Sequence, residues 1–362
     1  PGPGPGPDPA REPAARAPLR PLARAALRAA GAGAVLLAAV LAGICIGETA
    51  IPVPVVLRAL GNEILGAGYP IDRIDQGIVW NYRLTRAVVA ACCGAGLAVS
   101  GLILQSLLRN ALADPYLLGI SAGASTGAVM VTVAGVGAGA VSLSLGAFAG
   151  ALCAFALVAL LARAAGGGAG RHGTAQIVLA GIAGSQLFNA LTAFVITRSA
   201  SAEQARGIMF WLLGNLSGAR WRDVAIAVPV ALAAVAVCRW HARSLDAFTF
   251  GAESAASLGV AVRRVRAVLI LCASLATAVM VSIVGSIGFV GLVIPHAARF
   301  LVGARHARLV PATALIGAVF LIATDVLSRT LVRGQVLPIG VVTALVGAPV
   351  FALILVRGRP GR

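Results

Sequence analysis

The sequence contains no lysine, and all 29 of its basic residues are arginine. The P-loop signature of an ATPase requires a lysine that reaches the phosphates of ATP. Its absence excludes an ATPase of that type within this chain, so any ATP that drives the protein must be hydrolysed by another subunit. We therefore expect no enzymatic site, and no cofactor bound by the chain itself.

Charged and aromatic residues are also scarce, at 11% and 5% of the chain, whereas 59% of residues are hydrophobic. Soluble domains have about a quarter of their residues charged, so this composition is typical of a chain surrounded by membrane lipid. The hydrophobic residues gather in ten stretches, at 31–50, 84–108, 116–135, 139–163, 175–196, 224–240, 265–284, 286–302, 309–328 and 338–356.

The length of these stretches predicts membrane-spanning helices. A helix rises 1.5 Å per residue, so roughly 20 residues cross about 30 Å of hydrocarbon. We predict an all-α polytopic membrane protein with about ten transmembrane helices. The stretches that begin at Val224 and Ser286 are short, and would have to be tilted, kinked or extended by their neighbours.

Cysteine and histidine are too few and too scattered to indicate a metal site. The six cysteines all fall in apolar stretches without C-x-x-C spacing, and the four histidines are dispersed. The cysteines are typical of small buried apolar residues, not of disulfides or metal ligands. No metal cluster or nucleophile triad can be assembled from these residues with any specificity.

The formal net charge of +17 would favour nucleic-acid binding in a soluble protein. Its distribution indicates membrane topology instead. With the N-terminus in the cytoplasm and ten crossings, 19 of the 29 arginines fall on the inner side, which carries +14 against +3 outside. This bias obeys the positive-inside rule. We predict a multi-pass protein of the plasma or inner membrane, with both termini cytoplasmic and no nucleic-acid partner.

The first 30 residues are Pro/Gly-rich and then Ala/Arg-rich, with few large apolar side chains. Such a segment cannot bury enough surface to fold alone. We predict a disordered basic cytoplasmic tail over residues 1–30, followed by one transmembrane domain over residues 31–362. A signal peptide is the alternative, because basic residues precede an apolar stretch, but the length of the first stretch favours an uncleaved helix.

Two runs of glycine recur at four-residue spacing: Gly119, Gly123 and Gly127, then Gly146 and Gly150. In lipid, helices associate through close packing at small residues. These faces are expected to contact other helices.

The fifth stretch carries Ser185, Asn189 and Thr192 on one helical face, with Gln186 beside them. Polar groups within a membrane face protein or a water-filled path. One interpretation is interhelical hydrogen bonding, at about 0.6 kcal/mol for each bond. The other is that this face lines a translocation pathway.

The longest cytoplasmic connection, residues 244–262, separates the sixth and seventh stretches. We predict turns around Phe250 and Gly251, then a short helix over 252–258. A solvated loop is the alternative, but apolar side chains such as Phe250 and Leu258 favour a surface that another protein covers.

Four sequence blocks carry a resemblance to a known family. They are RLTRAVVAACCGAGLAVSGLILQSLLRNALADPYLLGISAG (Arg83–Gly123), FGAESAASLGV (Phe250–Val260), GSIGFVGLVIPHAARFLVG (Gly285–Gly303) and LPIGVVTALVGAP (Leu337–Pro349). In this order, and over essentially the whole chain beyond the tail, they closely resemble the FecCD-type permeases, the membrane subunits of ABC importers for iron-siderophores, haem and cobalamin.

The resemblance implies a type II ABC importer permease that forms a homodimer, or a heterodimer with a related permease. It also implies two cytoplasmic ATP-binding subunits, which hydrolyse the ATP, and an extracytoplasmic substrate-binding protein. It identifies residues 244–262 as containing the segment that couples the permease to the ATPase, which we call the coupling segment, and within it assigns ATPase contact to Gly251, Glu253, Ser257 and Gly259. A ferric siderophore is the first expectation for the cargo because it is the commonest in the family, with haem and cobalamin as alternatives.

The same resemblance assigns roles at two further places. Arg83, Arg86 and Arg329 match basic positions that pair with acidic residues of the binding protein, and we expect them at the outer surface. The fifth helix lines the central path in such permeases, which favours that role for Ser185, Asn189 and Thr192. For Arg329 a simpler alternative exists, because Asp325 lies four residues earlier and could pair with it.

Two other classes of membrane protein remain as alternatives. An ion-coupled secondary transporter usually has an ionisable residue near the bilayer midplane. Here Asp325 is expected near an outer helix end and Arg299 near an inner one. A structural or receptor-like membrane protein would leave the coupling segment unexplained.

Overall fold

The computed structural model describes residues 2, 21–137, 139–166 and 171–357. Most of the predicted tail, residues 1 and 3–20, lies outside the described residues. Residues 21–30 are helical and open the first helix, so the predicted boundary at residue 30 is wrong. The physical reason is local, because Ala, Leu and Arg are strong helix formers.

The described part of the chain is helical apart from short connections and one isolated bridge. Its elements are α1 (Pro21–Cys45), α2 (Val53–Leu65), α3 (Arg73–Gly77), the π-helical segment η1 (Ile78–Leu84), α4 (Thr85–Leu108), the 3₁₀ turn η2 (Pro115–Leu118), α5 (Ile120–Thr132), α6 (Leu143–Ala164), α7 (Arg171–Ser199), α8 (Ala202–Leu212), α9 (Trp221–Trp240), α10 (Ala242–Phe248), α11 (Ala252–Ser257), α12 (Val262–Val284), α13 (Val290–Val302), α14 (His306–Thr330) and α15 (Ile339–Arg357).

Among the described residues, seven helical spans are long and apolar enough to cross a membrane: α1 from Ala26, the continuous span Arg73–Leu108, α6, α7 from Ala175, α9, α12 and α14. Shorter apolar helices lie in α5, α13 and α15. Together these coincide with the ten predicted stretches, which confirms the all-α class.

The number of full-length crossings is lower than the number of apolar stretches. Helices α5 and α13 have 13 residues each, or about 20 Å at 1.5 Å per residue. The stretch at 286–302 was therefore rightly predicted to be short. The stretch at Val224 is extended by its neighbours, as the prediction allowed, because α9 begins at Trp221 and has 20 residues.

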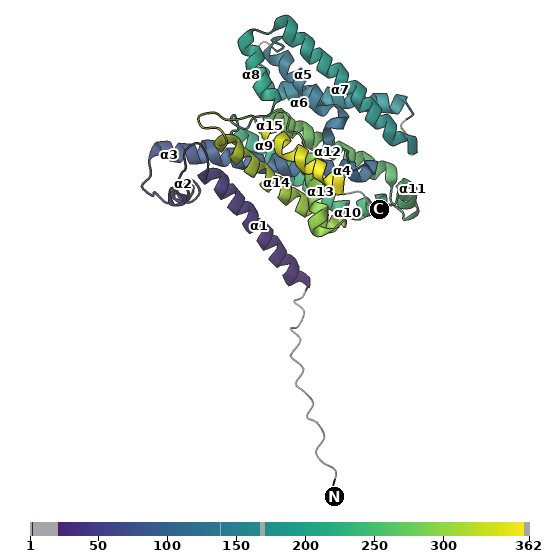
Figure 1. Cartoon of the computed structure of the whole chain (residues 1–362), viewed down its shortest axis with the longest axis horizontal. Helices are drawn as coiled ribbons and strands as arrows, with labels where there is room; N and C mark the ends of the chain where they lie inside the picture. Colours follow the sequence, from purple (N-terminus) through teal and green to yellow (C-terminus); the bar gives the residue numbers. More distant parts are fainter. Residues whose placement is uncertain (1, 3–20, 138, 167–170, 358–362) are drawn as a thin grey trace.

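Helix α4 forms the centre of the bundle and packs against α9, α12, α13 and α14 (Figure 1). Two glycine crossings make this close packing possible. A Cβ on Gly94 would lie 2.1 Å from the carbonyl oxygen of Gly317, and a Cβ on Gly101 would lie 2.0 Å from that of Gly291. Only glycine allows backbones to approach so closely.

A polar side chain in α4 satisfies a defect in α13. Pro295 has no backbone N–H, so the carbonyl of Gly291 lacks its usual helical donor. Gln105 Nε2 donates to that carbonyl at 3.1 Å and to the carbonyl of Leu292 at 3.2 Å. Arg299 in turn donates to Gln105 Oε1 at 2.9 Å, so α4 and α13 are fixed together.

Helices α5, α6 and α7 form a second group, which lies on the far side of the bundle from α1 in Figure 1. The two predicted glycine faces meet each other here. A Cβ on Gly123 would lie 2.3 Å from the oxygen of Gly150, and a Cβ on Gly127 would lie 2.0 Å from that of Gly146. The predicted helix contact is confirmed.

Candidate functional site

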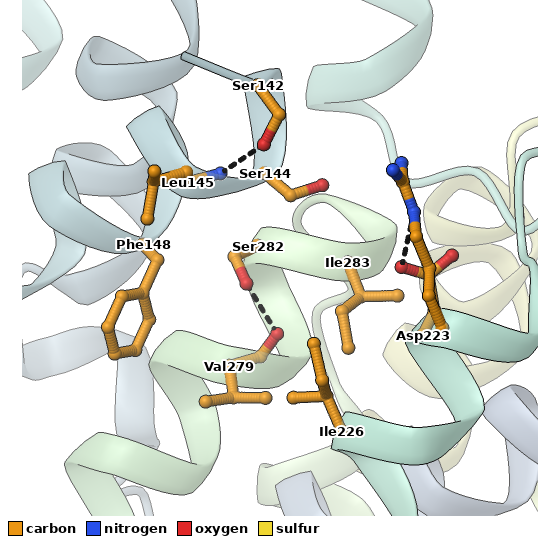
Figure 2. Close-up of a pocket in the computed structure, with 10 residues that line it drawn as sticks. Ser142, Ser144, Leu145, Phe148, Asp223, Ile226, Val279, Ser282 and Ile283 are labelled. Atoms are coloured by element: carbon orange, nitrogen blue, oxygen red, sulfur yellow. Dashed lines mark hydrogen bonds and ion pairs between the residues drawn. The ribbon is translucent and has the colours of Figure 1, made fainter. Parts of the chain in front are cut away.

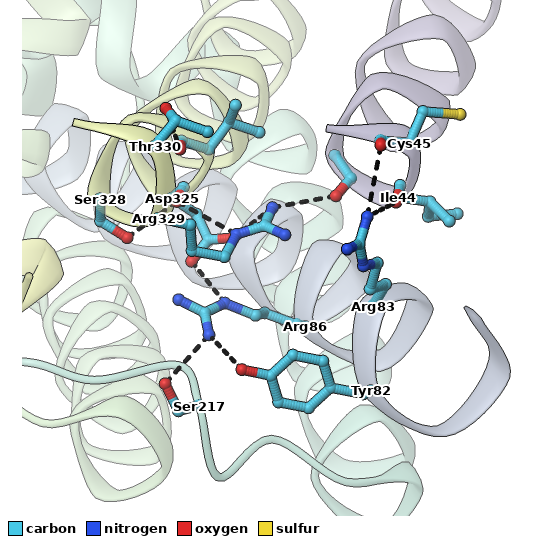
Figure 3. Close-up of polar contacts among 12 residues, drawn as sticks. Ile44, Cys45, Tyr82, Arg83, Arg86, Ser217, Asp325, Ser328, Arg329 and Thr330 are labelled. Carbon is cyan, nitrogen blue, oxygen red and sulfur yellow. Dashed lines mark hydrogen bonds and ion pairs between the residues drawn. The ribbon is translucent and has the colours of Figure 1, made fainter. Parts of the chain in front are cut away.

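Two arginines share one buried carboxylate at the end of the bundle where α4 begins and α14 ends (Figure 3). Arg86 Nε donates to Asp325 Oδ1 at 2.7 Å, and Arg329 Nη2 lies 3.0 Å from Asp325 Oδ2. Arg86 Nη1 also donates to the hydroxyls of Tyr82 and Ser217, each at 3.0 Å. This cluster joins α4 to α14 and to the loop before α9.

The cluster extends to the C-terminal end of α1. Arg83 donates to the carbonyl of Ile44 at 2.8 Å and to the carbonyl of Thr49. Arg329 Nη2 donates to the carbonyl of Gly43 at 2.9 Å. The last carbonyls of a helix lack intrahelical donors and carry partial negative charge, so these two guanidinium groups attach α1 to the bundle.

The predicted surface placement of the three arginines is wrong. Arg83, Arg86 and Arg329 are 4%, 2% and 4% exposed. The carboxylate of Asp325 and the carbonyls of α1 draw the guanidinium groups inward. The alternative that Arg329 pairs with Asp325 is confirmed, and the docking role of the three arginines stays a prediction.

The coupling segment folds as two short helices, α10 and α11. They lie at the end of the bundle opposite to the arginine cluster, where α4 ends and α14 begins (Figure 1). The helix predicted after Gly251 is confirmed as α11, whereas α10 was not predicted. Gly251 has φ +109, a conformation that glycine adopts readily. Phe250 and Leu258, on either side of α11, are 76% and 70% exposed.

The four residues assigned to ATPase contact lie in and around this helix. Glu253 is in the first turn of α11, and Ser257 at its last turn donates to the carbonyl of Glu253 at 3.1 Å. Gly259 follows with φ +81. All these residues except Gly251 are exposed, and Gly251 is half-buried. The segment therefore offers a surface with one acidic side chain, Glu253, and two exposed apolar side chains, Phe250 and Leu258, which we call the apolar rim.

Behind the coupling segment lies a buried contact that the sequence did not predict. His306, the first residue of α14, has Nδ1 2.7 Å from Asp246 Oδ1 on α10 and Nε2 2.8 Å from Ser106 Oγ on α4. His306 is 60 positions from Asp246 and 200 positions from Ser106 in the chain. Since no local pattern links residues at such separations, only the fold brings them together.

The three polar residues predicted to line a pathway on α7 have different surroundings. Thr192 is buried, with its Oγ1 2.8 Å from Thr126 Oγ1 of α5. For this residue the interhelical hydrogen bond is therefore the better interpretation. Asn189 and Gln186 are exposed on the single chain, and Ser185 is half-buried. The exposed pair leaves a polar patch on the outer face of α7.

A pocket of about 340 Å³ opens between the N-terminal ends of α6 and α9 and the C-terminal end of α12 (Figure 2). Its walls are mainly apolar, with Phe148 and Ile283 among them, and its polar groups are Ser142, Ser144, Ser282, Arg222 and Asp223. Ser142 accepts the backbone N–H of Leu145 and so caps α6. Ser142 thus holds a helix end.

Comparisons with known proteins agree along the whole described bundle. The profile of the FecCD transport family matches residues 35–357. The cobalamin import system permease protein BtuC of Halobacterium salinarum is 40% identical over 332 residues, which cover 90% of this chain and 87% of that protein. The Fe(3+) dicitrate transport system permease protein FecD of Escherichia coli is 35% identical over 307 residues, covering 85% of this chain and 92% of that protein.

A solved structure supports the same fold. It shows an inward-facing conformation of what is described as a metal-chelate type ABC transporter. One of its chains aligns with a TM-score of 0.78 and 28% sequence identity, covering 92% of this chain and 99% of that chain.

Proposed function

The chain belongs to the FecCD transport family, and from that premise we propose that it is the permease subunit of a binding-protein-dependent ABC importer for ferric siderophores. Its relatives are permeases of ABC importers for iron chelates, haem or cobalamin. It is therefore a multi-span membrane permease for substrates of this type and not an enzyme, and the ATPase is a separate subunit.

The observation that carries the proposal is the exposed apolar rim of the coupling segment. Phe250 and Leu258 are largely exposed, and they flank the short helix α11. An apolar pair of this kind at the end of a membrane bundle is typical of a surface that another protein covers. We assign that partner as the ATPase and orient this end, with both termini, toward the cytoplasm.

The proposed assembly contains two permease chains, identical or related, with two ATP-binding subunits and one extracytoplasmic binding protein. The polar patch of Asn189 and Gln186 on α7 suits a water-filled path between two chains, because polar groups in a membrane avoid lipid. The apolar side chains of Leu187, Leu191 and Phe194, exposed on the same helix, would be covered by the second chain or by lipid.

Cobalamin is the second candidate substrate, because the Halobacterium cobalamin permease is 40% identical over nine-tenths of the chain. The two candidates are separated by uptake in a strain from which the gene is deleted. Iron-labelled siderophores and cobalt-labelled cobalamin should be offered in turn. We expect the deletion to abolish siderophore uptake and spare cobalamin uptake. The reverse pattern would assign cobalamin instead.

A further inference from the structure

A chain of three side chains, of which Asp246 is partly exposed and the other two are buried, connects the coupling segment to the centre of the bundle. Asp246 lies on α10, His306 begins α14 and Ser106 lies on α4. His306 and Ser106 are 3% and 7% exposed, so water competes little for their hydrogen bonds. In such surroundings a satisfied polar network rigidifies the structure around it.

Asp246 also supplies the missing cap of α14. The first N–H groups of a helix have no intrahelical partner, and a carboxylate is favourable at that end. Arg305, at the N-cap position of α14, makes no side-chain cap hydrogen bond. The backbone N–H of His306 instead donates to Asp246 Oδ1 at 2.9 Å. Moving α10 must therefore carry α14 along or break two hydrogen bonds.

The contact to α4 does not depend on the protonation state of the imidazole. An ionised carboxylate only accepts hydrogen bonds, so Asp246 fixes a proton on Nδ1 of His306. If Nε2 carries no proton, the hydroxyl of Ser106 donates to it. If Nε2 is protonated, it donates to Ser106 Oγ, and the hydroxyl donates to the carbonyl of Leu102, 2.8 Å away. Either way, α4 and α14 stay connected.

These residue types are those of a serine-hydrolase triad, but their surroundings indicate a mechanical role. Ser106 lies in the middle of a buried helical segment, with its hydroxyl between Leu102 and His306. A nucleophile must reach a substrate carbonyl, and this hydroxyl is enclosed by protein. The three residues are positioning residues.

We propose that Asp246, His306 and Ser106 form a link that transmits movement of the coupling segment to α4 and α14. The inference rests on the proposed function, in which an ATPase moves α11. Helix α4 packs against α9, α12, α13 and α14, and α14 carries Asp325, which holds the far end of the bundle together. A displacement of α10 would thus be transmitted to both ends of the helix bundle.

Four variants separate the parts of this link. His306→Ala removes both hydrogen bonds of the imidazole but keeps the bond from the backbone N–H to Asp246. His306→Asn keeps a polar group near the Nδ1 position, and His306→Gln keeps one near the Nε2 position. Ser106→Ala removes only the bond to α4. His241→Ala is the matched control, because His241 lies at the α9–α10 junction, outside the link.

The permease should be assembled with its ATPase in liposomes, and both ATP hydrolysis and hydrogen exchange at residues 104–114 measured with and without ATP. We expect His306→Ala to retain ATP hydrolysis within about twofold while the ATP-induced change in exchange falls about tenfold, the effect of losing a charge-assisted hydrogen bond. His306→Asn and His306→Gln should each restore part of the ATP-induced change in exchange, and His241→Ala should match the wild type.

A wild-type exchange response in His306→Ala would overturn the link. If that variant fails to assemble, Ser106→Ala decides, since it removes a single oxygen, and a full response there would equally overturn the proposal. A wild-type chain that neither binds an ATPase nor responds to ATP would contradict the proposed function itself, which is a different result.

Discussion

Arg86 and Asp325 are 239 positions apart in the chain, yet Nε of Arg86 donates to Oδ1 of Asp325 at 2.7 Å, and both side chains are 2% exposed. A buried ion pair stabilises little compared with a well-packed apolar pair, but removing one partner leaves an unpaired buried charge. The pair therefore makes α4 and α14 dependent on each other at this end of the bundle.

Replacing Arg86 by Ala should destabilise the protein by about 1.5–3 kcal/mol, because Asp325 loses one charge-assisted hydrogen bond but keeps its pair with Arg329. Thermal unfolding of the detergent-solubilised protein measures the change. Arg222→Ala is the control, since Arg222 is largely exposed and lies 3.8 Å from Asp223, where a pair contributes at most about 1 kcal/mol. Equal unfolding temperatures for the two variants would show that the buried ion pair does not stabilise the protein more than the exposed pair does.

Gly127→Ala should destabilise the α5–α6 contact by about 1–3 kcal/mol, the usual cost of overpacking. The added Cβ would lie 2.0 Å from the carbonyl oxygen of Gly146, so the two backbones must move apart. Gly33→Ala in α1 is the matched control, because nothing lies within 4 Å of its added Cβ. It should be neutral or slightly stabilising, as Ala is the better helix former. Two variants of equal stability would contradict the close crossing.

Leu258→Ala should weaken co-purification of the ATPase subunit without changing the stability of the permease. Leu258 is 70% exposed, so its truncation removes little packing within the chain. Buried at an interface, a leucine side chain contributes about 1.5–3 kcal/mol, which corresponds to roughly tenfold or more in affinity. Leu65→Ala is the control, because Leu65 is equally exposed but lies at the end of α2. If Leu258→Ala retains the ATPase as well as the wild type does, the apolar rim does not contribute to ATPase binding.

Charge reversal of Arg83 and Arg329 distinguishes a role in docking the binding protein from a role in holding the helices together. The buried positions of these residues predict that Glu at both sites lowers expression and unfolding temperature, because carboxylates would then face the carbonyls of α1 and Asp325. Affinity for the binding protein is measured on the surviving fraction. Normal stability with lost affinity would instead support a docking surface.

Hydropathy predicted the ten apolar stretches because lipid selects for long apolar helices whatever their tertiary contacts. It did not predict α2, α3 or α8, which are short or carry polar residues and so lack that signal. It also did not predict that α5 is only 13 residues long, since the start of that helix is set by a local backbone conformation, the positive φ of Gly119.

The candidate site was predictable only where its signal is local. The helix after Gly251 follows from a continuous run of small and acidic residues, and the structure confirms it. The burial of Arg83 and Arg86 was not predictable, because their partners lie on α1 and α14. The contact between His306 and Ser106 had no sequence signal for the same reason, as each residue alone is unremarkable in an apolar helix.

In the proposed function, this chain is a permease driven by ATP that another subunit hydrolyses. The most direct test is uptake of an iron-labelled siderophore into liposomes that contain the chain, its ATPase subunit and the binding protein, with the chain alone as the control. We expect the chain alone to hydrolyse no ATP, and we expect uptake by the full assembly to require ATP and to persist without an ion gradient. ATP hydrolysis by the chain alone, or uptake driven by an ion gradient without the ATPase, would contradict it.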